Sequence, residues 1–105
     1  MGLDQTAYDA PPLSVRGKRP IDKVSRKIAD WRKDWPLHEV VCAIKGADPS
    51  HWICEVEITQ SDLAKIKERL SGGVESRDAM TTIRFLREAE DALASGRQVY
   101  YLANQ

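Results

Sequence analysis

The stretch from Leu37 to Thr59 constrains the fold most, because apolar residues alternate there on both sides of a turn-like sequence. The segment Gly46–Ser50 contains Asp, Pro and Ser, which are typical of turns. We therefore predict two strands, Leu37–Lys45 and His51–Thr59, that pair as an antiparallel hairpin. Side chains alternate between the two faces of a strand, so the even-numbered apolar residues should share one buried face. These residues are Val40, Cys42, Ile44, Trp52, Cys54, Val56 and Ile58.

Helical periodicity is present on either side of this hairpin. Between Ile21 and Asp34, apolar residues recur at the spacing of one helix face, and Pro36 should end that helix. Two more helices are predicted later in the chain, over Leu63–Leu70 after a Ser61-Asp62 cap and over Arg77–Ala94 after Ser76. A last β-prone run follows at 98–102. On the longest helix we expect the buried side to consist of Ala79, Met80, Ile83, Leu86, Ala89 and Leu93.

The predicted order is helix, strand, strand, helix, helix, strand. It indicates a small single α+β domain over residues 21–105, in which the hairpin, extended by the last strand to a three-stranded sheet, packs on the helices. Residues 1–20 have no periodicity and are broken by Pro11, Pro12 and Pro20. We predict that they form a flexible tail with a basic end.

Charge and hydropathy narrow the class of protein. The 105 residues include 16 basic and 16 acidic side chains, so the net charge indicates no particular partner. We see neither a signal peptide nor an apolar run long enough to span a membrane, and we expect a cytoplasmic protein. Two cysteines do not indicate a disulfide scaffold.

A metal site in the hairpin would have to use His38, Cys42, His51 and Cys54. The predicted register brings Cys42 opposite Cys54 but points His51 to the other face, and there is no Cys-x-x-Cys pair. We therefore predict no metal or other cofactor, and we expect two reduced cysteines that act as small core residues.

The odd-numbered face of the hairpin combines carboxylates with apolar groups. Glu39 should lie opposite Glu57, which would suit acid–base catalysis only if a cleft and an orienting partner were present, and neither is indicated. Nucleophile motifs are also missing, so we predict that the protein is not an enzyme. Apolar side chains ringed by charges favour contact with another protein. The predicted partner-binding face consists of Glu39, Val41, Ile53, Glu55 and Glu57.

In size and composition the chain is similar to small bacterial or phage accessory proteins that inhibit or regulate another protein by binding it. We therefore predict an interaction module, whose partner is another protein or a second copy of this chain. The alternative is a regulator that binds nucleic acid, because residues 16–33 are strongly basic. Its phosphate contacts would come from Arg16, Lys18, Arg19, Lys23, Arg26 and Lys27.

Overall fold

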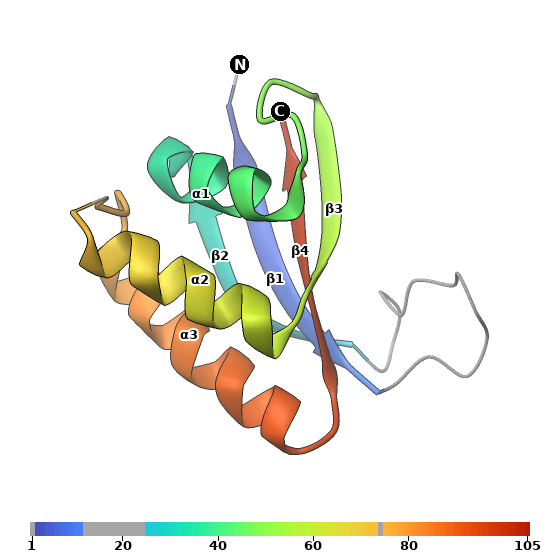
Figure 1. Ribbon diagram of the computed structural model, residues 1–105. Coiled ribbons are helices and arrows are strands. Elements are labelled where there is room, and N and C mark those ends of the chain that lie inside the picture. The colour runs from blue at the N-terminus through green and yellow to red at the C-terminus, as the bar shows by residue number, and fades with distance from the viewer. Residues whose placement is uncertain (1, 12–24, 74) are drawn as a thin grey trace.

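One antiparallel sheet and a layer of helices make up the protein. The computed structural model describes residues 2–11, 25–73 and 75–105. Within them, four strands are arranged in the spatial order β2-β1-β4-β3, and three helices lie against one face of the sheet (Figure 1). In chain order the elements are β1 (Asp4–Ala10), β2 (Arg26–Arg32), α1 (Trp35–Lys45), β3 (Ile53–Ile58), α2 (Gln60–Ser71), α3 (Ala79–Ala94) and β4 (Gln98–Asn104). The predicted α+β class is confirmed, but the sheet has a fourth strand and the element order differs.

The first arm of the predicted hairpin is a helix, so the predicted antiparallel pairing of Leu37–Lys45 with His51–Thr59 is wrong. Helix α1 begins after Asp34, whose side chain caps it, and has Pro36 in its first turn. It ends at Gly46, which adopts the left-handed conformation with φ of 69°. Proline at the start and glycine just past the end are strong helix signals, and they outweigh the β-branched residues between them.

The segment predicted as the first helix contains strand β2. Residues 21–24 lie outside the described residues, but Arg26–Arg32 pairs with β1, with Ile28 left out of the pairing. The register shifts between Ala7 and Tyr8, which marks a β-bulge. The bulge lets the neighbouring residues Ile28 and Ala29 both be buried. Ile28 and Trp31, three residues apart, are therefore both buried, which imitates the spacing of a helix face.

Strand β1 is formed by residues that we expected to belong to a tail without regular structure. It pairs with β2 on one side and with β4 on the other, so it is central in the sheet. The residues of β1 that face the helices are Gln5, Ala7 and Asp9, all nearly inaccessible to solvent. Because two of these three are polar, the strand has no apolar alternation. Residues 12–20 of the predicted tail lie outside the described residues.

Helices α2 and α3 and strand β4 confirm the predictions for the second half of the chain, with small shifts at the ends. Thr59 caps α2 through a reciprocal capping box with Asp62. Asp78, rather than Ser76, caps α3 through the main-chain N–H of Thr81.

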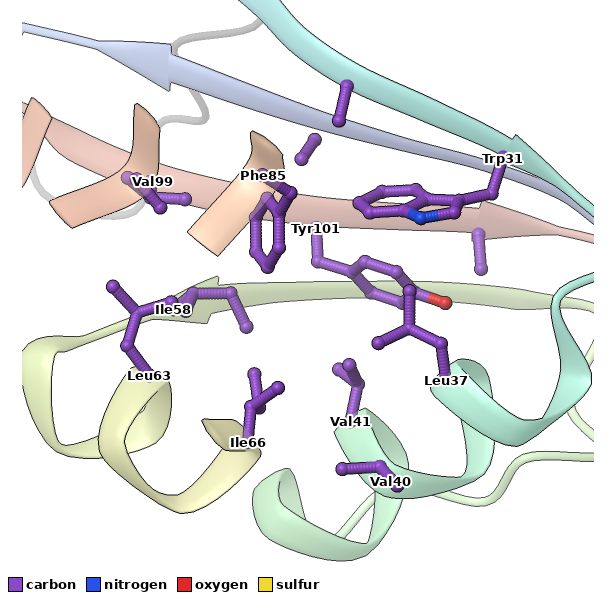
Figure 2. Close-up of a cluster of buried hydrophobic side chains, with 14 of the residues drawn as sticks. Trp31, Leu37, Val40, Val41, Ile58, Leu63, Ile66, Phe85, Val99 and Tyr101 are labelled. Atoms are coloured by element: carbon purple, nitrogen blue, oxygen red, sulfur yellow. The ribbon is translucent and has the colours of Figure 1, made fainter. Parts of the chain in front are cut away.

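The core lies between the sheet and the helices (Figure 2). Tyr101 on β4 and Trp31 on β2 are almost fully buried, and Phe85 on α3 packs edge-on against Trp31 at 5.2 Å between ring centroids. The predicted inward face of the second hairpin strand is confirmed at Cys54 and Ile58, which are buried in this core, and Val56 is partly buried against it. Trp52 was predicted on the same face, but it is exposed. The structure thus leaves the other face of the sheet without a helix among the described residues.

Candidate functional site

Among the described residues, Trp52 has the most exposed aromatic side chain. Its exposed fraction is 64%. It lies in the short connection between α1 and β3, and its ring stacks on that of His51, with centroids 6.3 Å apart. An indole so accessible to water is unusual, because tryptophan is highly buried on average. Tryptophan also contributes strongly to protein interfaces, so this side chain is a candidate contact for another protein.

The connection that carries Trp52 is firmly held. The carbonyl oxygen of Trp52 accepts a hydrogen bond from the main-chain N–H of Gln105 at 2.8 Å. The side-chain amide of Gln105 donates to the carbonyl oxygens of Pro49 at 2.7 Å and His51 at 2.8 Å. Asp48 closes the turn by accepting from the main-chain N–H of Ser50 at 2.9 Å. These hydrogen bonds fix the backbone, so little conformational entropy would be lost when a partner binds.

Ile53 follows directly and is 37% exposed at the start of the edge strand β3. The His51 ring nitrogen Nδ1 lies 2.8 Å from the carbonyl oxygen of Ile53 and 3.4 Å from its main-chain nitrogen. The imidazole thus occupies main-chain groups at the sheet edge. It favours contact through side chains over addition of a further strand.

Glu55 and Glu57 share with Ile53 the sheet face that no described helix covers, as we predicted for these three residues. Glu57 is exposed, and its carboxylate lies 3.4 Å from the side-chain amide of Gln98. Burial, and then the negative charge of Glu57, raise the pKa of the neighbouring Tyr100. We call Trp52, Ile53, Glu55 and Glu57 the β3-edge surface.

The other two residues of the predicted face do not belong to it. Glu39 is exposed on α1, on the helical side of the sheet, so it does not lie opposite Glu57. Val41 is 1% exposed and packs in the core, so it is not accessible to a partner. Both errors have the same cause: a helix presents residues two apart to different sides, whereas a strand presents them to the same side.

His38, Cys42 and Cys54 do come together, although Cys42 is on a helix. His38 Nδ1 lies 2.8 Å from the Tyr101 hydroxyl, and its Nε2 lies 3.6 Å from the Cys42 sulfur. Burial lowers the pKa of His38 and raises the pKa of Cys42 to about 12, so the histidine is neutral and the thiol protonated near pH 7. A buried protonated thiol is a poor nucleophile. Within the described residues, no three His, Cys, Asp or Glu side chains are placed to hold a metal ion.

Two of the six predicted phosphate-binding residues lie on β2, and both form ion pairs. Arg26 donates to Asp9 at 2.6 Å and 2.9 Å, and Lys27 lies 2.9 Å from Asp30. Arg16, Lys18, Arg19 and Lys23 lie outside the described residues. Both of the described cations therefore have a carboxylate partner within the fold.

A groove with a volume of about 840 Å³ lies between α2 and α3. The sequence did not reveal it. It is lined by Lys67, Leu70, Glu75, Ile83, Leu86 and Arg87, among others, and we call it the α2–α3 groove. The predicted buried side of α3 is partly wrong: Ile83 is 64% exposed and Met80 is 83% exposed. The buried stripe of α3 instead consists of Thr82, Phe85, Ala89 and Ala92.

None of the described helices combines the length and the apolar character that crossing a membrane requires. Comparison with protein-family models, with curated proteins and with solved structures finds no significant match to this chain.

Proposed function

We propose that this chain is a non-enzymatic interaction module that binds another protein through the β3-edge surface. The observation that carries the proposal is the 64% exposure of Trp52 on a backbone held by Gln105. Indole rings presented in this way act as anchors, because they bury a large apolar area in a partner's pocket at small entropic cost.

The charges beside this anchor specify the partner further. Glu55 and Glu57 follow Ile53 along the same strand face, and Asp48 lies in the turn before Trp52. The partner should therefore present an apolar pocket for the indole next to basic side chains. Complementary charge would speed encounter and set the orientation, while burial of Trp52 and Ile53 would supply affinity. A module of this kind can act as an inhibitor or regulator of the protein that it binds.

The test is an affinity capture from a cell lysate of the source organism with three baits: the wild-type chain, Trp52→Ser and Trp35→Ser. Trp35 is also an exposed tryptophan, but it lies at the start of α1, outside both the β3-edge surface and the α2–α3 groove, so its variant is the matched control. The proposal expects a protein that the wild type and Trp35→Ser retain and Trp52→Ser loses. A partner retained equally by all three baits would refute the role of the β3-edge surface.

Each lysate is divided, and one half is treated with nuclease. A protein partner should survive this treatment. Recovery of nucleic acid, or of proteins that disappear after nuclease, would instead support the alternative that the basic N-terminal region binds phosphates.

A further inference from the structure

The α2–α3 groove has an apolar floor that the rest of the fold does not fill. Leu70 and Leu86 line it and continue the hydrophobic core outward. Ile83 stands on its rim, and Met80 lies one turn earlier on the same helix, with most of its side chain in water. The same patch therefore has both a hollow and protruding apolar side chains. A surface with both features can fit a copy of itself.

The charges on the rim also suit self-association. Glu75 lies at the end of the groove that is formed by the connection between the two helices. Arg87 lies further along α3. Neither side chain forms an ion pair within the described residues, whereas Lys67 and Glu90, which also line the groove, pair with each other. The unpaired charges of opposite sign are thus separated along the groove.

We propose that the α2–α3 groove is the interface of a twofold-symmetric homodimer. In an antiparallel pair of α3 helices with the symmetry axis at Ile83, Met80 of each copy lies against Leu86 of the other, since the two residues are equally far from Ile83 in opposite directions. Arg87 then lies opposite Ala79, next to the segment that contains Glu75. Every contact occurs twice, as an isologous interface requires. This interface is separate from the β3-edge surface, and each can exist without the other.

The test is sedimentation velocity on the full chain between about 10 µM and about 1 mM, the range in which weak dimers dissociate. The wild type should show a concentration-dependent dimer, and Ile83→Asp should remain monomeric. Lys65→Glu, on an exposed position of α2 outside the groove, is the control and should dimerise as the wild type does. Circular dichroism checks that each variant is folded, which we expect because Ile83 is mostly exposed.

A charge exchange tests the orientation of the two copies. Arg87→Glu alone and Glu75→Lys alone should each weaken the dimer by about tenfold, and the double variant should recover most of that loss. A wild type that stays monomeric at every concentration would overturn the proposal and leave the groove to a different partner. A dimer that Ile83→Asp leaves unchanged, or a double variant weaker than both single ones, would overturn it equally.

Discussion

The carboxylate of Asp34 accepts a hydrogen bond from the main-chain N–H of Arg77 at 2.9 Å, across 43 residues of sequence. The same carboxylate caps α1 through Leu37, and it also accepts from the main-chain N–H of Asp78 at 3.0 Å. One buried side chain thus fixes both the start of α1 and the segment that leads into α3.

Replacing Asp34 with Ala should therefore destabilise the protein by about 3 kcal/mol or more, because it removes a helix cap and leaves buried N–H groups without acceptors. Asp78→Ala is the matched control: it removes the cap of α3, whose carboxylate accepts hydrogen bonds from Thr81, and should cost about 1 kcal/mol. Urea denaturation of both variants measures the difference. Equal losses would show that the contact with Arg77 and Asp78 contributes nothing.

Substitutions at Val41 and Glu39 test whether this segment forms helix α1 rather than the predicted strand. Val41→Ala should cost about 2 kcal/mol, because Val41 is 1% exposed and its truncation leaves a cavity, whereas Glu39→Ala should change stability by less than about 0.5 kcal/mol. Thermal and urea unfolding measure both. If Val41→Ala were as harmless as Glu39→Ala, the placement of α1 in the core would be wrong.

The charge of Asp9 should stabilise the fold, and this contribution to the free energy of unfolding should be lost at acid pH. Burial acts to raise its pKa, but hydrogen bonds from Arg26 and Arg97 outweigh burial and hold the pKa below its usual value. A lowered folded pKa means that this contribution is complete above the unfolded value of about 3.9 and is lost as pH falls through the folded pKa.

The variant Asp9→Asn removes that dependence. It should be less stable than the wild type by about 2 kcal/mol near neutral pH, and the difference should shrink once the pH falls below about 3. Unfolding by urea at a series of pH values measures it. A difference that stays constant down to acid pH would show that the Asp9 charge is not what stabilises this corner of the sheet.

The two cysteines should be unreactive in the folded protein. Burial raises the pKa of Cys54 as well as that of Cys42, and both side chains are shielded from solvent. Incubation with iodoacetamide near neutral pH, followed by mass spectrometry, should show labelling of both thiols only after unfolding. Rapid labelling of the native protein would mean that α1 detaches readily from β3.

Local signals in the sequence were sufficient to locate the helices and the strand of the second half of the chain, although not the buried side of α3. Helix α2 and α3 each follow a capping residue and have a regular apolar stripe, and β4 is a run of β-prone residues. The prediction for the first half of the chain failed because the local signals there conflict. Val40 and Val41 favour a strand, yet Asp34, Pro36 and Gly46 delimit a helix.

Strand β1 could not be recognised for a different reason. Its inward residue Gln5 is polar because it satisfies buried groups that lie far away in the sequence: it donates to the Tyr101 hydroxyl at 2.9 Å and accepts from the main-chain N–H of Asp34 at 2.9 Å. Asp9 is polar because it pairs with Arg26 and Arg97. Such partners become visible only in three dimensions.

The candidate surface was predicted in part. Ile53, Glu55 and Glu57 were assigned correctly to one sheet face, because β3 is a strand with regular alternation. Trp52 was assigned to the core by the same alternation, which fails where the strand has not yet begun.

The most direct test of the proposed function is the dissociation constant of the captured partner, measured by isothermal titration calorimetry for the wild type, Trp52→Ser and Trp35→Ser. Loss of a buried indole anchor should weaken binding by at least about tenfold, while Trp35→Ser should bind as the wild type does. A Trp52→Ser variant with unchanged affinity would contradict the central claim that the β3-edge surface is where this protein binds its partner.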